Sequence, residues 1–263
     1  MPEITFQSQK IYYTVSGAGS ALVFIHGFGV DSRFWDAFVS RFQKSHQVIC
    51  IDMPGAGKSG AISGLTVEGM AQVVRAVVEE LHLPGFVLTG HSMGGYVALA
   101  YAEKWPESVH ALCMFHSQPY PDSEEKKAAR LKSMDFVRTN GAAPLVSQLV
   151  PALFTPAFVR DNPSLIQQLI GWASAYPVEG VVNALDAMRQ RPDRSEVLRN
   201  AKYPVLFLIG AEDGAIPAEA SKQQTTLPSV SSIHYLEGVA HMGMLEATEK
   251  TQGIFSEFLN EIS

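Results

Sequence analysis

Residues 86–95 read FVLTGHSMGG, and the fold can be worked out from this segment. Its first four residues are apolar or β-branched, which predicts a short strand buried on both faces. Ser92 then stands in the pattern G-x-S-x-G, which is typical of a sharp, strained turn from a strand into a helix. Such a turn needs small neighbours, and Gly90, Gly94 and Gly95 supply them. We therefore expect the Ser92 hydroxyl at a helix N-terminus, where developing negative charge is stabilised.

Strand and helix patterns alternate on both sides of this segment. Short apolar or alternating runs predict further strands at 4–8, 10–17, 21–25, 47–52, 109–116, 204–210 and 231–236. Helices are predicted at 32–43 with Asp31 as the cap, at 66–82 with Thr66 as the cap, at 92–104 and at 246–260. Alternation in units of this length is typical of βαβ crossovers. The predicted fold class is therefore α/β with a mostly parallel sheet.

The pattern changes between residues 119 and 200. This part contains no apolar strand run, and its helical stretches stand at 123–141, 163–176 and 178–191, separated by glycine and proline. We predict one domain with an insert. Its α/β core consists of residues 1–118 and 201–263, and a helical insert of residues 119–200 covers the ends of the sheet like a lid.

Composition excludes several classes of protein. Hydrophobic residues make up 46% of the 263 residues and charged ones 17%, which excludes a disordered chain. The net charge is −6 and no run is rich in Lys or Arg, so nucleic acid is not expected as a partner. Cys50 and Cys113 lie in apolar runs and are predicted to be buried, reduced thiols. With no signal peptide or membrane span visible, we expect a cytoplasmic protein without a membrane partner, either a monomer or a homodimer.

A serine hydroxyl needs a base, and His241 is the best candidate. It lies in the loop between the last strand and the last helix, which emerges at the same edge of a parallel sheet as Ser92. Surface or structural roles are expected for the histidines at the ends or inside of other elements, namely His26, His46, His82, His91, His110 and His234. His116 closes a strand at the active edge, so a place in the pocket stays open for it.

The imidazole in turn needs an acid that orients it. Asp213 directly follows a predicted strand at the correct edge and precedes His241 by 28 residues. Glu212 beside it remains the alternative. The other acids considered are worse placed, because they lie within or next to the insert: Asp122, Asp186 and Asp193.

The segment His26-Gly27-Phe28-Gly29 follows the strand at 21–25. An oxyanion hole needs one backbone N–H from such a loop and one from the residue after the nucleophile. We assign these donors to Phe28 and Met93. Glycines on both sides of Phe28 allow a close approach of the backbone.

Five segments together resemble the α/β-hydrolase family: HGFG (26–29), DMPGAGKSG (52–60), GHSMGG (90–95), GAEDGAIP (210–217) and GVAHMGMLE (238–246). They stand in the family's order and extend from about residue 20 to the end of the chain. The resemblance implies a central sheet of about eight strands with helices on both faces and a helical cap after the sixth strand. It also implies Ser92 as nucleophile, His241 as general base and acid, and Asp213 as the orienting acid. Dehalogenase and epoxide-hydrolase relatives carry aspartate at the position of Ser92 and are disfavoured.

The segment 52–59 looks superficially like a phosphate-binding loop. The pattern G-x-x-x-x-G-K-[ST] requires glycine at position 52, where Asp52 stands, so nucleotide binding is disfavoured. No cluster of His, Cys and Asp has the spacing of metal ligands. Neither a metal nor a cofactor is expected.

The expected reaction is transfer of an acyl group to water, with a small or medium, uncharged or weakly polar ester as substrate. Because protonated histidine is no base, and its reference pKa is about 6.5, activity is expected on the alkaline side. The side chains expected to bind the substrate lie next to the catalytic groups or in the insert: Phe28, His116, Trp172, Tyr176 and Met242.

Two alternatives to an ester hydrolase stay open. Hydrolysis of an enol-lactone or of a carbon–carbon bond would use the same triad. Relatives with those activities often bind a substrate carboxylate with an arginine, and the insert contains Arg130, Arg138, Arg160 and Arg189. A protein of another class would keep the fold but bind its ligand with slow or no turnover. The charged helix that begins at residue 123 is expected to be a solvated face.

Overall fold

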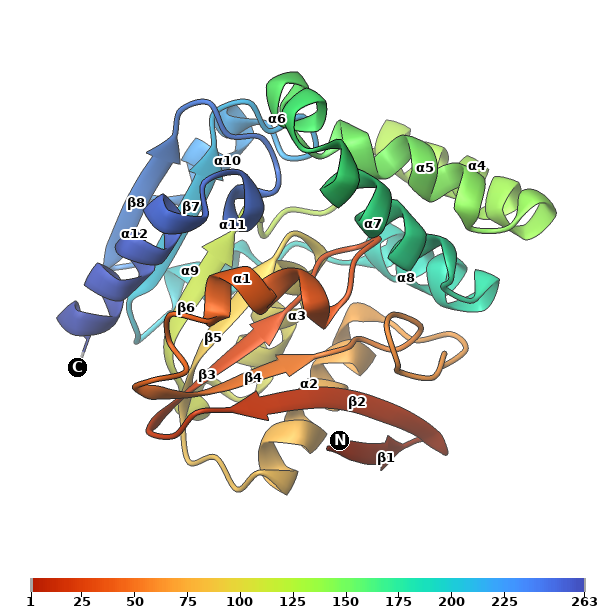
Figure 1. Cartoon of the computed structure of the whole chain (residues 1–263). Coiled ribbons are helices and arrows are strands. Elements are labelled where there is room, and N and C mark those ends of the chain that lie inside the picture. Colours follow the sequence, from red (N-terminus) through yellow and green to blue (C-terminus); the bar gives the residue numbers. More distant parts are fainter. Residues whose placement is uncertain (1, 263) are drawn as a thin grey trace.

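The computed structural model describes residues 2–262, and within them eight strands form one sheet (Figure 1). Its order is β1-β2-β4-β3-β5-β6-β7-β8. The strands are β1 (Glu3–Phe6), β2 (Gln9–Ser16), β3 (Ser20–Ile25), β4 (His46–Ile51), β5 (Phe86–His91), β6 (Val109–Phe115), β7 (Val205–Gly210) and β8 (Ser231–Leu236). β2 runs antiparallel to β1 and β4, and the other neighbours pair in parallel. The predicted eight-stranded, mostly parallel sheet is confirmed.

Helices pack on both faces of the sheet. On one face lie α2 (Val67–Glu80), α3 (Met93–Lys104) and α9 (Ser195–Arg199). The opposite face carries the 3₁₀ helix η1 (Ser32–Trp35) with α1 (Asp36–Val39), α11 (Gly243–Glu246) and α12 (Thr248–Glu261). A short helix, α10 (Ala218–Gln224), precedes β8. Strands β5 and β7 are buried along their whole length, as continuous apolar runs between two helical layers should be.

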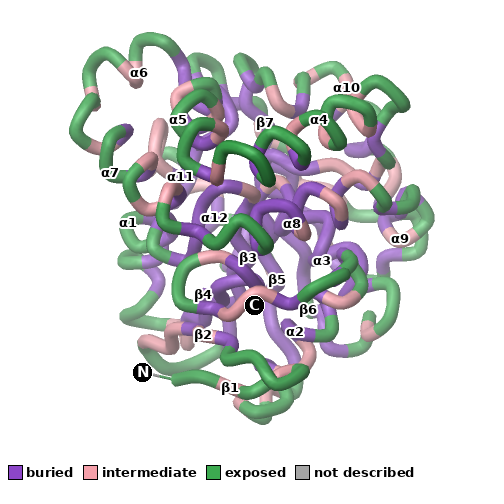
Figure 2. Tube along the Cα trace, turned by 90° about the vertical axis from the view of Figure 1, so that its right-hand side faces the viewer, coloured by how far each residue is buried: buried purple, intermediate pink, exposed green. Residues whose placement is uncertain are grey.

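The chain between β6 and β7 is helical. It forms α4 (Glu124–Asn140), α5 (Ala143–Ala152), α6 (Pro156–Asp161), α7 (Pro163–Ser174) and α8 (Val178–Gln190) before α9. The helices α4 to α8 lie beyond the carboxyl ends of the parallel strands, and much of their outer surface is exposed (Figure 2). Of the helices between β6 and β7, α4, α7 and α8 match predicted stretches, whereas α5, α6 and α9 were not predicted. Pro156 and Pro163 stand in the first turn of a helix, where a missing N–H costs nothing, so they begin helices as well as separating them.

Two predicted helices are interrupted. The helix expected at 32–43 forms only η1 and α1, although Asp31 accepts the backbone N–H of Arg33 as predicted. Its aromatic side chains instead pack inward, with Trp35 and Phe38 ring centroids 5.1 and 6.1 Å from Phe24. The helix expected at 246–260 breaks at Ala247, whose backbone is not helical (φ −140°, ψ 50°).

The expectation that both cysteines are buried is met. Cys50 and Cys113 are buried free thiols, and burial raises the pKa of both. No helix in residues 2–262 has the length and apolar character needed to cross a bilayer.

Candidate active site

Ser92 adopts the backbone conformation that its motif requires. It lies between β5 and α3 with φ of 51° and ψ of −116°, a strained combination for a residue with a side chain. The neighbouring glycines make this turn sterically possible. A Cβ on Gly90 would stand 2.3 Å from the carbonyl oxygen of Gly94, and one on Gly94 would stand 2.3 Å from that of Ile25. Larger residues would push the Ser92 turn away from β3.

His241 is bound to the carboxylate of Asp213. Its Nδ1–H donates to Oδ2 of Asp213 at 2.7 Å, which leaves Nε2 as an acceptor. The other oxygen, Oδ1, accepts the N–H groups of Ala215 and Ile216 at 2.8 and 2.9 Å. Burial alone would raise the pKa of Asp213, but the charge and hydrogen bond of His241 outweigh it and lower that pKa below its ordinary value. Glu212, the alternative acid, is exposed and is not bonded to His241.

Glu246 organises the loop that carries His241. Its Oε1 accepts the backbone N–H groups of Ala240 and Met242, the two neighbours of the histidine, at 3.1 and 3.2 Å. Its Oε2 accepts the N–H of Thr155, in the insert, at 2.9 Å. One carboxylate therefore holds the histidine loop and ties it to the insert.

The backbone of His241 has two further partners. Its N–H donates to the carbonyl of Leu153, in the insert, at 3.0 Å. Its carbonyl accepts Nε2–H of His91 at 2.9 Å, and burial lowers the pKa of His91 well below its ordinary value. His91 thus stays neutral and has a structural role beside Ser92.

Ser92 and His241 line the same cavity, which has a volume of about 230 Å³. The remaining lining residues come from both the core and the insert: Phe28, Tyr96, Lys126, Arg130, Leu149, Leu153, Met188, Gly214, Ala215 and Ile216. The cavity therefore lies at the junction of the two regions.

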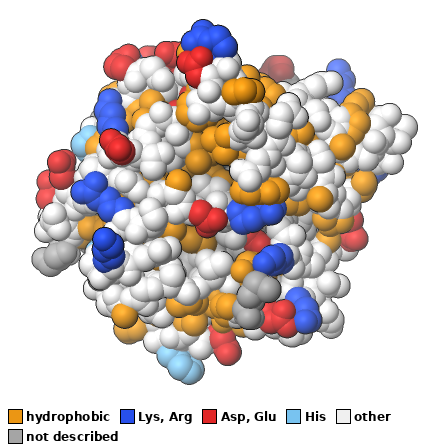
Figure 3. Space-filling model, viewed as in Figure 1, with side chains coloured by type: hydrophobic (Ala, Val, Ile, Leu, Met, Phe, Trp, Pro, Cys, Tyr) orange, Lys and Arg blue, Asp and Glu red, His pale blue; other side chains and the backbone are white. Residues whose placement is uncertain are grey.

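Figure 3 shows hydrophobic side chains gathered on the molecular surface near α6, α7 and α11.

The two backbone segments assigned to the oxyanion hole lie next to Ser92. A Cβ on Gly27 would stand 3.2 Å from Cβ of Ser92, so the loop that carries Phe28 approaches the serine closely. Met93 is the first residue of α3, and its N–H has no partner within the helix. Hydrogen bonds of the His26 ring stabilise the loop, with Nδ1–H donating to Gly27 O at 2.7 Å and Nε2 accepting the Met53 N–H at 2.9 Å.

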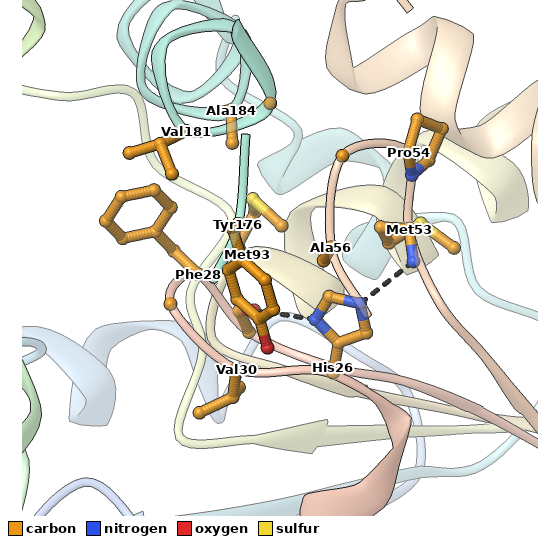
Figure 4. A pocket seen from close by; sticks show the side chains of 14 residues that line it. His26, Phe28, Val30, Met53, Pro54, Ala56, Met93, Tyr176, Val181 and Ala184 are labelled. Atoms are coloured by element: carbon orange, nitrogen blue, oxygen red, sulfur yellow. Dashed lines mark hydrogen bonds between the residues drawn. The ribbon is translucent and has the colours of Figure 1, made fainter. Parts of the chain in front are cut away.

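A second, apolar cavity of about 20 Å³ lies beside this loop (Figure 4). Phe28 lines both cavities, and Met93 and Tyr176 line the smaller one. The Tyr176 hydroxyl donates to Oδ2 of Asp31 at 2.6 Å, which fixes its ring against the loop. Phe28 and Tyr176 are thus the two predicted substrate-binding residues that the structure brings to a cavity.

The structure does not bring His116, Trp172 and Met242 to either cavity. His116 is buried, and its Nδ1 and Nε2 face the backbone N–H groups of Gly210 and Gly243 at 3.0 and 3.3 Å. Burial lowers the pKa of His116 to about 3, so it is a neutral support of the neighbouring loops. Met242 is fully buried in the core. The ring of Trp172 lies 4.1 Å from the Arg33 guanidinium, at the junction of insert and core.

The larger cavity has a polar wall, of which the sequence indicated Arg130 as one of four candidate arginines in the insert but did not indicate Lys126. Lys126 and Arg130 project into it from α4, the helix that was expected to be a solvated face. Lys126 and Arg130 are spaced four residues apart, which places them on one side of α4. That spacing is the signal that could have revealed them.

The three other acids considered from the sequence each bind a group other than His241. Asp122 binds Arg130 and Arg191, whereas Asp186 binds Arg189. Asp193 accepts the N–H of Ser195 at 2.7 Å.

The segment that resembles a phosphate loop is filled by a carboxylate. Oδ1 and Oδ2 of Asp52 accept the N–H groups of Ser32 and Lys58 at 2.9 and 2.8 Å. These backbone donors are therefore not available to a phosphate. Nowhere in residues 2–262 does a group of His, Cys, Asp and Glu side chains form a candidate metal site.

The chain is similar to known hydrolases in sequence and fold. Residues 22–251 match the model of the Alpha/beta hydrolase family. A thermophilic esterase from Thermogutta terrifontis, solved with malate bound, has a TM-score of 0.94 and is 28% identical, over 99% of this chain and 98% of its own. The 3-oxoadipate enol-lactonase 2 of Acinetobacter baylyi is 26% identical over 80% of this chain and 78% of its own. The 2-hydroxy-6-oxononadienedioate/2-hydroxy-6-oxononatrienedioate hydrolase of Escherichia coli is 25% identical over 95% and 91%.

Proposed function

The chain belongs to the alpha/beta hydrolase family, and we propose that this enzyme cleaves a small or medium carboxylic ester through an acyl-enzyme. One observation carries the proposal. Ser92, in a strained turn, and His241, bonded to Asp213, line one cavity beside two backbone segments suited to an oxyanion hole. A nucleophile, a base and an orienting acid in this order are the requirements of serine acyl transfer.

In the proposed reaction Ser92 Oγ attacks the ester carbonyl while His241 Nε2 accepts its proton. The N–H groups of Phe28 and Met93 stabilise the oxyanion, and the paired Asp213 stabilises the imidazolium. His241 then gives the proton to the leaving alcohol, and the acyl group stays on Ser92. A water molecule, deprotonated by His241, attacks this acyl-enzyme. As the bond to Ser92 Oγ breaks and the acid leaves, His241 returns the proton to Ser92 Oγ.

The two cavities support a small substrate. Because Phe28 lines both, an ester held at the oxyanion hole would extend one part into the 230 Å³ cavity and a smaller apolar part toward the 20 Å³ cavity. The helical insert of residues 119–200 is proposed to act as the cap over this site, since Leu149, Leu153 and Met188 line the larger cavity.

A second candidate function is hydrolysis of an enol-lactone that carries a carboxylate. Arg130 lines the larger cavity, and one relative bears the name 3-oxoadipate enol-lactonase. The same serine, histidine and aspartate would open a lactone ring, with the leaving oxygen remaining attached to the acyl group.

Hydrolysis of 4-nitrophenyl esters of two to twelve carbons by wild type and Ser92→Ala tests the main proposal. We expect turnover of the short and medium esters that is lost in Ser92→Ala. The chain length with the highest kcat/KM would then give the size of the acyl site. Equal turnover by both proteins would contradict the role of Ser92, and absence of turnover at every length would favour the lactone.

A further inference from the structure

The wall of the larger cavity carries a cation that has no counter-ion. Lys126 lines the cavity from α4, and its Nζ donates to the carbonyl of Ala215 at 3.1 Å. No ion pair within residues 2–262 includes Lys126. Burial, followed by the like charge of Arg130, lowers the pKa of Lys126. The ammonium group thus lies in an environment that opposes its charge.

The neighbouring carboxylates are committed to other groups. The charged residues that act on Lys126 are the cations Arg130 and Arg191 and the anions Asp122 and Asp213. Asp122 accepts hydrogen bonds from Arg130 and lies 2.8 Å from Arg191 Nη1. Asp213 holds the imidazole of His241. Two carboxylates therefore face three cations, which leaves one positive charge at the cavity without compensation.

The nearby arginines are cations themselves, so they cannot balance this excess positive charge. The Arg191 side chain is only 1% exposed, its guanidinium lies 3.9 Å from the ring centroid of Tyr96, and its Nη2 has no hydrogen-bond partner in residues 2–262. Arg191 is paired with Asp122, so the cation left without a counter-ion is the half-buried Lys126. Removing a charge from water without a counter-ion is costly, and an anion from outside the chain would lower that cost. Tyr96, Lys126 and Arg130 all face the cavity that Ser92 lines, so a bound substrate is the source within reach.

We propose that Lys126 binds a carboxylate of the substrate, with Arg130 beside it, so that the preferred substrates are esters or lactones that carry one free carboxylate. The proposal rests on the proposed hydrolysis at Ser92 and specifies its substrate class. A lysine suits this role because its ammonium group has three donors, of which the Ala215 carbonyl takes one. The scissile carbonyl is then at Ser92 while the free carboxylate of the substrate is at the α4 wall.

The test compares two substrates that differ in charge but hardly in shape. One is mono-4-nitrophenyl glutarate. The other is 4-nitrophenyl 5-methylhexanoate, in which an isopropyl group replaces the carboxylate. Release of nitrophenolate, corrected for spontaneous hydrolysis, gives the ratio of the two kcat/KM values. We expect wild type to prefer the glutarate at least tenfold, and Lys126→Met to lower the ratio at least tenfold. Lys126→Arg keeps the charge and is expected to retain most of the preference.

Lys127→Met is the matched control, because Lys127 is the next residue of the same helix and pairs with Glu124 instead. This variant should leave the ratio unchanged. A wild-type enzyme without preference for the glutarate would overturn the proposal. So would a Lys126→Met enzyme that loses activity on both substrates equally, since Lys126 would then only tie α4 to the Ala215 loop.

A binding measurement separates this proposal from the proposed function. Glutarate itself is titrated by calorimetry against two proteins, the Ser92→Ala variant and the double variant that also carries Lys126→Met. Millimolar binding that is lost with Lys126→Met supports the carboxylate site even if no nitrophenyl ester is hydrolysed. Absence of binding to both proteins, or equal binding to both, overturns it even if neutral esters are hydrolysed.

Discussion

The α/β core and the helical insert reach the same cavity in different ways. The core contributes Ser92 and His241, with Asp213 bonded to the histidine, and all three stand on loops that follow strands of the sheet. The insert contributes whole helix faces, including Lys126 and Arg130. Turns at strand ends are set by local sequence, whereas the residues that a helix turns inward depend on what it packs against. We therefore assign the proposed chemistry to the core and the proposed selection of substrate to the insert.

The two regions are joined by polar bonds that converge on the site. Glu246 binds Thr155, His241 binds Leu153 and Asp31 binds Tyr176, each across the junction. A displacement of the insert would therefore strain these hydrogen bonds and shift the loop of His241 and the loop of Phe28. The predictions that follow test this division, first within the core and then across the junction.

The largest effect is expected from a change confined to the core. Asp213→Asn should lower kcat by about 10⁴-fold, because the imidazole loses the partner that holds its tautomer and its charge. Steady-state hydrolysis of a nitrophenyl ester measures it. Glu212→Gln, one residue away and exposed, should retain activity within about twofold. A comparable loss in Glu212→Gln would show that the acid has been misassigned.

Glu246→Ala tests the junction at the histidine loop. Three backbone N–H groups lose their acceptor, and His241 loses its fixed position. We expect kcat to fall roughly 10–100-fold, as for other residues that orient a catalytic group, with a smaller change in KM. The unfolding temperature should fall as well. Glu249→Ala, on the exposed side of α12, serves as the control.

If Glu246→Ala lost stability but kept its kcat, the Glu246 carboxylate would have a structural role only. A shift of the pH–rate profile together with the lower kcat would support its effect on the imidazole.

Tyr176→Phe tests the junction at the Phe28 loop. It removes the hydroxyl bonded to the buried Asp31 and leaves the ring in place. Loss of a buried donor costs about 1–3 kcal/mol, which lowers the unfolding temperature of a chain this size by roughly 2–8 °C. Differential scanning calorimetry measures the shift. Tyr235→Phe on the exposed edge strand β8 should change it little, and an equal shift in both variants would contradict a special role of Tyr176.

The smallest effect is expected where α2 of the core meets the end of the insert. Glu68 pairs with Arg194. Burial alone would raise the pKa of Glu68, but the hydrogen bond and charge of Arg194, together with hydrogen bonds from the Glu68 backbone and Thr66, outweigh burial and lower that pKa. A lowered carboxyl pKa stabilises the fold above the unfolded-state value, and this contribution is lost as the pH falls through the folded-state value. Because Glu68 is half exposed, we expect Glu68→Gln to lower the free energy of unfolding at pH 7 by no more than about 1 kcal/mol.

Urea titrations of wild type and Glu68→Gln at pH 7 and pH 3 measure this contribution. The two proteins should differ more at pH 7 than at pH 3, because the contribution shrinks as the pH falls toward and through the lowered folded-state pKa of Glu68. A difference of the same size at both pH values would mean that the substitution acts through packing. Glu107→Gln, on the exposed 3₁₀ turn before β6, is the control.

The sequence by itself determined the family, the mostly parallel sheet and the positions of the candidate serine, histidine and acid. These features have local signatures: apolar runs for buried strands, glycines around Ser92, and loops that follow strands. The sequence left the choice between Asp213 and Glu212 open, and it is the structure that bonds Asp213 to His241. Such features depend on residues close together in the chain.

Only the tertiary structure decided what surrounds these groups. Trp172 in the insert, Met242 beside His241 and His116 at the end of a strand were all expected to bind the substrate, yet packing turns them toward other partners. Lys126 and Arg130, in a helix whose composition indicates a solvated face, instead line the cavity. The reason is physical: a charged helical face is stable either in water or against compensating charges, and only long-range packing determines which of the two it meets.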